Sequence, residues 1–312
     1  MSRAALTSIG LASNTGVDMK ILLTGKNGQV GFELQRSLAV LGDVIAVDHA
    51  DCDLADPAAI RRLVRDVKPR LIVNPAAYTA VDKAESEVEL ATAINAHAPG
   101  LLGEEARRLG ALLIHYSTDY VFDGSGYAWH REIDAPNPQS VYGRTKLQGE
   151  QALQASGADH LVFRTSWVFG AHGGNFAKTM LRLAAEREQL KVVADQYGAP
   201  TSAALLADVT AQIVSQWQRN PDCFPLGLFH LVAGGVTNWH AYAQAVIAAA
   251  QAAGKPLKLR AEDIEAISTD EYPTPARRPL NSRLDTALLR ETFGLNLPDW
   301  RQGLDHVMQQ IL

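Results

Sequence analysis

The segment Thr24-Gly25-Lys26-Asn27-Gly28-Gln29-Val30-Gly31 says more about the architecture of this 312-residue chain than any other. It follows a short apolar run, Lys20 to Thr24, that has no polar alternation and predicts a buried parallel strand. After it, leucines at helical spacing predict a helix from Glu33 to Leu41. The glycines therefore stand in a strand–turn–helix unit, which is the context that a dinucleotide-binding turn requires.

Each glycine of this turn has a separate role in that prediction. Gly25 permits the tight turn, Gly28 lets the backbone approach a pyrophosphate, and Gly31 lets the helix pack closely on the sheet. The anion then meets the free N–H groups at the helix N-terminus, where Gln29 and Val30 lie.

A second buried strand is predicted from Asp43 to Asp48, and its final carboxylate bears on the choice of cofactor. An acidic residue at this place can bond the adenine ribose, which favours NADH. Lys26 lies nearby and can tolerate the 2′-phosphate of NADPH, so the sequence leaves both cofactors open. Asp53 and Leu54 follow where an adenine edge can lie.

Strands and helices go on alternating as far as about residue 165. Asp56 and Pro57 predict the start of a helix that Pro69 ends. Further strands are predicted at Leu71–Asn74, Ala111–Tyr116 and His160–Thr165, and further helices at Glu85–Leu109 and Tyr142–Ala155. This alternation predicts a Rossmann-type α/β fold, with a doubly wound parallel sheet covered on both faces.

The pattern changes after about residue 170. A glycine-rich loop, Gly170 to Gly174, is followed by the predicted strands Leu190–Val193 and Leu228–Val232 and the predicted helices Ala203–Gln218 and Trp239–Ala252. We interpret 19–170 as mainly the dinucleotide-binding domain and 171–312 as mainly a smaller mixed α/β substrate lobe, with some return to the main sheet. Residues 1–18 are predicted to be a disordered extension that precedes Met19.

Composition narrows the classes of function. The net charge of −5 offers no basic surface for nucleic acid and argues against docking on an anionic membrane. No apolar run reaches the roughly 18–20 residues of a membrane span. The two cysteines, Cys52 and Cys223, form no CxxC or Cys/His cluster, so no zinc site is predicted and a cytoplasmic location is expected. A homodimer is expected only because symmetric pairs are the commonest assemblies.

Tyr142 and Lys146 form the chemical centre of the prediction. Their spacing, at the start of a predicted helix, places both side chains on one helical face. A lysine ammonium beside a phenol lowers the phenol pKa from about 10 toward working pH, which suits a general acid. The strand that begins at Ile114 supplies Thr118 at its polar end, and this hydroxyl can bond a substrate carbonyl oxygen. Together these features predict a nicotinamide-dependent oxidoreductase.

The order of these motifs resembles the extended short-chain dehydrogenase/reductase superfamily. More narrowly, the chain resembles the dTDP-4-dehydrorhamnose reductase family in both lobes, over about residues 19 to 312. The stretches that carry this resemblance are Gly25–Gly31, Asn74–Glu85, Tyr116–Phe122, Arg164–Phe169, Asn175–Leu181, Asp195–Thr201 and Tyr272–Pro279.

The resemblance implies an activity and roles for named residues. The activity is NAD(P)H-dependent reduction of the 4-keto group of dTDP-4-dehydro-6-deoxy-L-mannose to dTDP-L-rhamnose, the final step of dTDP-rhamnose synthesis. Tyr142 is the implied proton donor, Lys146 its partner and a ligand of the nicotinamide ribose, and Thr118 a substrate contact. Other implied cofactor contacts are Gly28, Gln29, Val30, Asp48, Asp53, Leu54, Ala77, Tyr78 and Thr79. Asp119 and Trp167 are the implied contacts of the nucleotide-sugar.

Further residues are assigned with less support from the motifs. Arg277 and Arg278 are candidates for pairing with the substrate diphosphate, as arginine forks do. Asn175 and Lys178 are candidate helpers. Tyr120, Asp82, Lys83 and His115 are interpreted as structural.

One departure separates this chain from similar sugar-nucleotide dehydratases. Those enzymes follow the threonine with Asp-Glu, whereas here Thr118-Asp119 is followed by Tyr120. The base that would take a proton from C5 is therefore absent, which argues for simple reduction. Some members of the reductase family bind a divalent metal such as Mg²⁺ between subunits, and the sequence shows no carboxylate cluster to assign to one.

Two alternatives remain open. Another sugar-nucleotide ketoreductase or an epimerase could use the same three residues. A non-catalytic regulatory subunit, like that of methionine adenosyltransferase, could share the fold, although binding alone requires no activated phenol.

Overall fold

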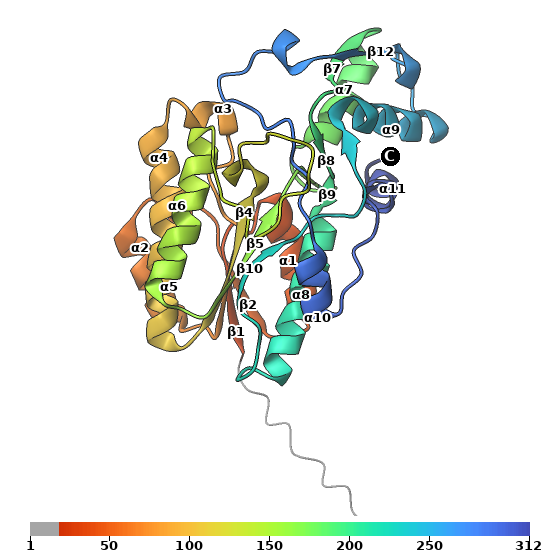
Figure 1. Ribbon diagram of the computed structural model, residues 1–312. Coiled ribbons are helices and arrows are strands. Elements are labelled where there is room, and N and C mark those ends of the chain that lie inside the picture. Colours follow the sequence, from red (N-terminus) through yellow and green to blue (C-terminus); the bar gives the residue numbers. More distant parts are fainter. Residues whose placement is uncertain (1–18) are drawn as a thin grey trace, which may run out of the picture.

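A parallel sheet of six strands forms the centre of the molecule, in the order β10-β5-β4-β3-β1-β2 (Figure 1). The computed structural model describes residues 19–312. The strands are β1 (Lys20–Leu23), β2 (Asp43–Ala46), β3 (Leu71–Asn74), β4 (Leu112–Thr118), β5 (His160–Thr165) and β10 (Gly227–His230). All five neighbouring pairs are parallel. Strand order reverses between β1 and β3, so the predicted doubly wound sheet is confirmed, and a crevice is expected at that reversal.

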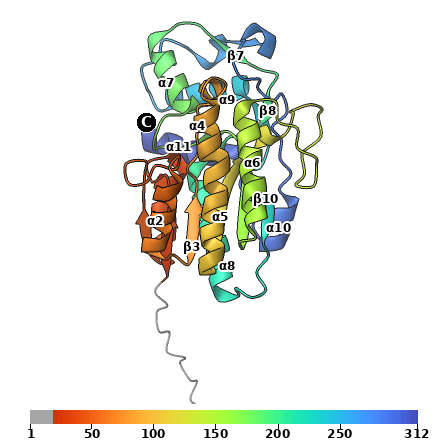
Figure 2. The same ribbon diagram turned by 90° about the vertical axis from the view of Figure 1, so that its left-hand side faces the viewer.

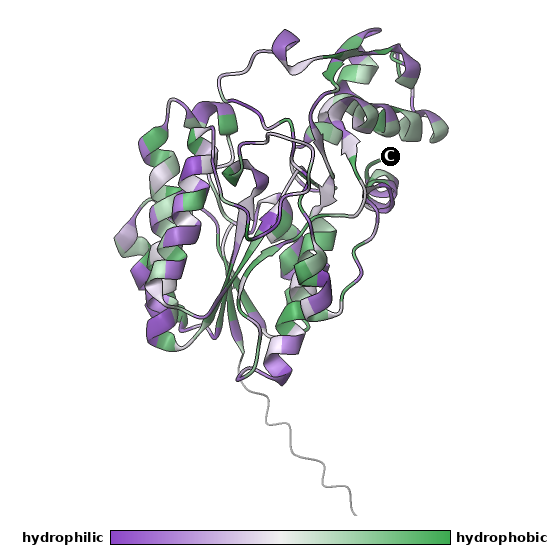
Figure 3. Ribbon diagram, viewed as in Figure 1, coloured by the Kyte–Doolittle hydropathy of each residue, from purple (hydrophilic) through white to green (hydrophobic). Residues whose placement is uncertain are grey.

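Helices cover both faces of this sheet, as Figures 1 and 2 show. One face carries α2 (Pro57–Val67), α5 (Ala98–Leu109) and α6 (Val141–Ser156), and the other carries α1 (Gln29–Leu38), α8 (Ala203–Arg219) and α10 (Ala287–Phe293). Leu22 packs in the core of the first face, whereas Ile21 and Leu23 pack in that of the second. Burial of both faces explains why the strand sequences are continuously apolar, and Figure 3 shows this apolar centre.

A smaller lobe stands beyond the carboxyl ends of the strands. Its helices are α7 (Phe176–Glu186), α9 (Trp239–Ala252) and α11 (Trp300–Ile311). Its short strands pair as β7 (Leu190–Val193) with β12 (Ile264–Ile267), β8 (Tyr197–Gly198) with β11 (Thr237–Asn238), and β6 (Val168–Phe169) with β9 (Thr201–Ser202). A separate apolar core that includes Phe169, Tyr242 and Trp300 holds the lobe together.

The proposed division at residue 170 stays a prediction. Three elements that come after it, α8, β10 and α10, belong with the main sheet and its covering helices. The interpretation of residues 1–18 lies outside the described residues.

The helix predicted from Glu85 to Leu109 is largely confirmed, because helical residues run without a break through α4 (Val88–Thr92), a π-helical turn (Ala93–His97) and α5. The run begins three residues later than predicted, since Glu85 ends a separate short helix, α3 (Val81–Ala84). The first helix also begins at Gln29, earlier than predicted, so the glycine turn leads directly into α1.

Candidate active site

A cavity of about 1090 Å³ opens at the carboxyl ends of the central strands, where the strand order reverses. This exceeds the roughly 300–1,000 Å³ of a site for one drug-sized ligand and suits two ligands side by side. The structure brings together around it the following predicted residues: Gly25, Gly28, Gln29, Val30, Gly31, Asp48, Asp53, Leu54, Ala77, Thr79, Thr118, Asp119, Tyr142, Lys146 and Trp167.

Three predicted site residues do not line this cavity. The Tyr78 hydroxyl turns away and donates to Glu87 at 2.5 Å. Arg277 is exposed. Arg278 donates to Asp82 at 2.6 Å and to the Tyr120 hydroxyl at 3.2 Å, so its guanidinium is engaged within the protein. Their contacts with cofactor or substrate stay predictions.

The glycine turn is shaped for close approach of a ligand. Gly25 has φ +63°, a conformation that side chains disfavour. A Cβ on Gly31 would lie 2.0 Å from the Gly25 carbonyl oxygen, so only glycine lets α1 pack here. The backbone N–H of Gly28 donates to Gly25 at 2.9 Å and closes the turn. The cradle therefore fits the pyrophosphate of a dinucleotide.

The end of the cavity next to β2 is acidic. Asp48 lies at the cavity and accepts a hydrogen bond from Asn27 at 2.5 Å. Lys26 is paired with Asp51 at 2.5 Å and lies 3.7 Å from Asp48. The lysine is therefore neutralised by carboxylates, and the pKa of Asp51 is lowered mainly by its hydrogen bond from Lys26.

The π-helical turn holds the loop that carries Ala77 and Thr79. Asn95 in this turn accepts from the Tyr78 backbone N–H at 2.8 Å and donates to the Tyr78 carbonyl at 3.1 Å. One buried amide thus fixes the loop that follows β3. No helical periodicity predicts this role, because it depends on a contact with a distant segment.

Tyr142 stands on the first turn of α6, beside the end of β4. Ser140 caps this helix by accepting a hydrogen bond from the Gly143 N–H at 3.1 Å. A Cβ on Gly143 would lie 2.2 Å from the Tyr120 carbonyl oxygen, so glycine brings the helix close to the strand end. Burial raises the pKa of the Tyr142 phenol, and a hydrogen bond with Thr118 partly offsets this. The Tyr120 ring packs edge-on against Tyr142, with centroids 5.4 Å apart.

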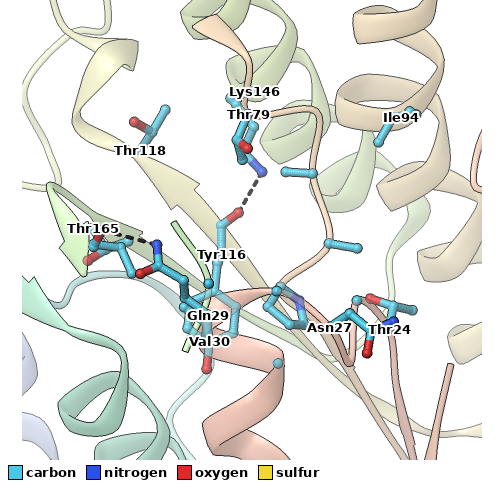
Figure 4. Close-up of a pocket in the computed structure, with 18 of the residues that line it drawn as sticks. Thr24, Asn27, Gln29, Val30, Thr79, Ile94, Tyr116, Thr118, Lys146 and Thr165 are labelled. Atoms are coloured by element: carbon cyan, nitrogen blue, oxygen red, sulfur yellow. Dashed lines mark hydrogen bonds between the residues drawn. The ribbon is translucent and has the colours of Figure 1, made fainter. Parts of the chain in front are cut away.

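Lys146 points along the floor of the cavity. Its Nζ donates to the Tyr116 carbonyl at 2.6 Å, as Figure 4 shows, and lies 3.0 Å from His115 Nε2. Burial lowers the pKa of Lys146 to about 7, against a smaller opposite effect of Glu150. The expectation that the lysine lowers the phenol pKa is therefore not met in this structure, where burial of Tyr142 dominates.

Another part of the cavity wall is formed by Asp119 and two tryptophans. Asp119 is 2% exposed, and burial raises its pKa to about 6. Trp167 has φ +49°, an unusual conformation for a bulky residue, and stacks on Trp239 with centroids 3.8 Å apart. Trp239 also lines the cavity and was missed by the sequence analysis, because it opens a helix of the other lobe.

The glycine-rich loop between β6 and α7 reaches over to the glycine turn. Asn175 donates to Gln29 Oε1 at 3.0 Å, and His172 Nε2 lies 3.0 Å from the Asn27 carbonyl. Lys178 bonds the carbonyls of Ala171 and Gly173. Asn175 and Lys178 thus shape the rim of the cavity.

Residues 19–312 contain neither a metal-binding cluster nor a membrane-spanning helix. They hold no group of three or more His, Cys, Asp and Glu side chains placed to bind a metal ion. Within the same range, no helix is long and apolar enough to cross a membrane.

A dinucleotide cradle and a Tyr-Thr-Lys set at one cavity define a nicotinamide-dependent oxidoreductase of the short-chain type. Residues 19–312 match the family model described as the RmlD substrate binding domain, and the chain belongs to that family.

Curated and solved relatives agree with this placement. The chain is 52% identical to dTDP-4-dehydrorhamnose reductase of Escherichia coli (strain K12), over 94% of this chain and 98% of that protein. It resembles the crystal structure of a dTDP-4-dehydrorhamnose reductase from Clostridium acetobutylicum, with TM-score 0.85, 37% identity and coverage of 93% and 99%. The Bacillus anthracis enzyme in complex with NADP has TM-score 0.85 and 32% identity, with coverage of 94% and 100%.

Proposed function

We propose that this protein reduces the 4-keto group of dTDP-4-dehydro-6-deoxy-L-mannose to dTDP-L-rhamnose with NADPH or NADH, the final step of dTDP-rhamnose synthesis. The convergence of Tyr142, Thr118 and Lys146 on the cavity that the glycine turn opens carries this proposal. The extensive identity to reductases of that name supports the choice of substrate.

The proposed reaction divides the work between cofactor and protein. When bound, a reduced nicotinamide supplies the hydride. Gln29 and Val30 would hold the pyrophosphate with backbone N–H groups at the start of α1, Gly28 would let the backbone approach it closely, and Asp48 would bond the adenine ribose. Asp53, Leu54, Ala77 and Thr79 line the rest of the cofactor side.

Tyr142 donates the proton to the former carbonyl oxygen of the sugar. Because burial raises its pKa, the phenol is protonated near neutral pH and ready to act as an acid. Thr118 donates a hydrogen bond to the same oxygen as charge develops there. Lys146 would hold the nicotinamide ribose, one helical turn from the phenol. Asp119 and Trp167 hold the nucleotide-sugar.

We further infer a preference for NADH over NADPH. The phosphate of NADPH would approach Asp48 and Asp51, and Lys26 beside them is already paired with Asp51. The cavity keeps room for either cofactor, so the preference is one of degree.

The test is the absorbance of reduced nicotinamide, with the keto-sugar generated in the same tube from dTDP-glucose. Wild-type protein should oxidise the cofactor only when the keto-sugar is present and should form dTDP-L-rhamnose. Tyr142→Phe should lose turnover about 100-fold or more while still binding NADH, because only the transferred proton is removed. Tyr127→Phe, whose ring is 85% exposed, is the matched control and should keep full activity.

Other outcomes point elsewhere. Bound NAD with no net cofactor consumption would identify an epimerase. Cofactor binding with no turnover on any keto-sugar would favour a regulatory subunit.

We also propose a cytoplasmic location and a homodimer. The two cysteines are unpaired, Cys52 buried and Cys223 exposed, which suits a reducing compartment. Cell fractionation and light scattering test these two points.

A further inference from the structure

A buried series of hydrogen-bonded side chains ends at the amine of Lys146, and the proposed reaction does not use its other members. His115 is completely buried, and its Nε2 lies 3.0 Å from Lys146 Nζ. On the other side of the ring, Nδ1 lies 3.1 Å from the side-chain nitrogen of Asn74. Asn74 in turn accepts a hydrogen bond from the Thr24 hydroxyl at 2.6 Å. The chain thus runs from the start of the glycine turn to the lysine.

The sheet itself sets this alignment. Thr24 follows β1, Asn74 ends β3 and His115 lies in β4, three strands that are neighbours in the sheet. Asn74 and His115 are register partners, so their side chains stand side by side on one face. Asn74 is 1% exposed, and Thr24 is also 1% exposed although it borders the cavity. Side chains buried to this degree depend on one another for their hydrogen bonds.

The positions of these side chains allow two hydrogen-bond arrangements, and the first is the one in the structure. In one, Thr24 donates to the Asn74 oxygen, Asn74 donates to His115 Nδ1, and the ring proton on Nε2 faces a neutral Lys146 amine. In the other, the Asn74 side-chain amide is rotated by 180°. His115 Nδ1–H then donates to the Asn74 oxygen, and His115 Nε2 accepts from a Lys146 ammonium. The Tyr116 carbonyl accepts an N–H from the lysine in both. The two states differ by one proton on Nζ.

We propose that His115 is a positioning residue for Lys146: its ring fixes the direction of the amine and, with Asn74 and Thr24, lets the amine hold or release a proton while the buried members of the chain keep their partners. This inference rests on the proposed function, in which Lys146 holds the nicotinamide ribose and supports Tyr142. It replaces the interpretation of His115 as merely structural.

The surroundings of His115 keep its imidazole ring neutral beside the lysine. Burial and the nearby Lys146 lower the pKa of His115 well below its ordinary value. Glu150, one turn further along α6, is itself bonded to Ser117 and to Arg164 of β5. The other titratable groups around the lysine are Tyr142 on its own helix, Tyr116 on β4, and Asp119 and Tyr120 after β4. Three carboxylates of α3 and of the residues that follow it are engaged elsewhere: Asp82 with Arg278, Glu85 with Val141, and Glu87 with Tyr78.

The test compares three variants of the full-length protein. His115→Leu removes both ring nitrogens, and His115→Gln restores a polar atom that can reach Lys146. His230→Leu is the matched control, because His230 is also a completely buried histidine of the sheet, in β10, but its ring bonds the Asp285 carbonyl. Keto-sugar reduction and NADH binding, the latter by quenching of tryptophan fluorescence, are each measured across the Lys146 pKa of about 7.

His115→Leu should move the basic limb of both pH profiles downward by about one unit, because the hydrogen bond that the ammonium loses is charge-assisted and stronger than the one that the neutral amine loses. Its kcat at neutral pH should fall about tenfold, while His115→Gln recovers most of the loss and His230→Leu keeps the wild-type profiles. Unshifted profiles in His115→Leu, or an equal shift in His230→Leu, would overturn the inference. Wild-type protein that binds NADH but does not reduce the keto-sugar would instead contradict the proposed function, and the binding profiles would still test the role of His115.

Discussion

Tyr142 and Lys146 lie one helical turn apart, and burial moves their proton affinities in opposite directions. A buried phenol resists becoming an anion, so its pKa rises, whereas a buried amine resists becoming a cation, so its pKa falls to about 7. At neutral pH the tyrosine therefore keeps the proton that the reaction needs. The lysine stands near the midpoint of its titration, and its charge depends on its polar neighbours.

Cofactor preference should respond to one carboxylate. Asp48→Asn removes the negative charge nearest the expected 2′-phosphate and frees Lys26 from one of its two acidic neighbours. We expect the ratio of kcat/KM for NADPH to that for NADH to rise about tenfold, corresponding to about 1.4 kcal/mol. Asp43→Asn, at the exposed opposite end of the same strand, is the control. An unchanged ratio in Asp48→Asn would exclude this carboxylate from the ribose site.

At the scale of the element, helices α2 and α5 are joined by one buried carboxylate. Glu105 is 1% exposed and accepts hydrogen bonds from Arg61 at 3.0 Å and from Arg65 at 2.7 Å. These arginines, led by Arg65, lower the pKa of Glu105 to about 2. Asp56, which accepts from the Ala58 N–H at 2.8 Å, and Pro57 begin α2 as the sequence predicts. The residues at its N-terminus thus determine where α2 begins, and the ion pairs with Glu105 determine where α2 packs.

Glu105→Gln should destabilise the fold by about 1–3 kcal/mol at neutral pH, since its partners stay partly hydrated. Because the folded-state pKa lies below the ordinary 4.5, the stabilisation is complete above about 4.5 and is lost as pH falls toward about 2. Urea unfolding at several pH values should show this slope in the wild type and a weaker slope in Glu105→Gln. Glu104→Gln, which removes the exposed neighbouring carboxylate, should change little. Equal slopes in all three proteins would contradict the assignment.

At the scale of the whole molecule, the second lobe is tied to the sheet domain around the rim of the cavity. The Asp82 carboxylate of α3 accepts from Arg278 at 2.6 Å and from the Ala276 N–H at 3.2 Å. On the opposite rim, the Gln29 side chain donates to the Val168 carbonyl at 3.3 Å. These contacts hold the two walls of the site at a fixed separation.

Asp82→Ala should therefore weaken substrate binding more than it weakens the fold. With Asp82 41% exposed, its ion pair contributes about 1 kcal/mol or less to stability. We expect KM for the keto-sugar to rise several-fold, with Tm nearly unchanged, because the segment that carries Arg278 loses its anchor. Lys83→Ala, the exposed neighbour on α3, should leave KM unchanged. A large loss of Tm without a change in KM would assign the pair a purely structural role.

Short-range patterns in the sequence were sufficient to predict the parallel sheet, the glycine turn, and the placement of Tyr142 and Lys146 on one helical face. Each depends on residues a few positions apart, whose geometry the backbone fixes. For the same reason the sequence predicted the bounds of β3 and β5 and the first residue of α2 correctly. The π-helical turn within the long helix after β3 was not predicted, because Asn95 in this turn bonds a segment outside the helix.

Only the tertiary structure decided which partners the buried polar groups take. The sequence placed Lys146 beside Tyr142, but the folded sheet turns its amine toward His115 and the Tyr116 carbonyl. Trp239 joins Trp167, and Arg278 reaches Asp82 across a sequence separation of 196 residues. Local sequence fixes the conformation of a segment, whereas the contacts that tune pKa and shape a cavity depend on segments that meet only when the chain is folded.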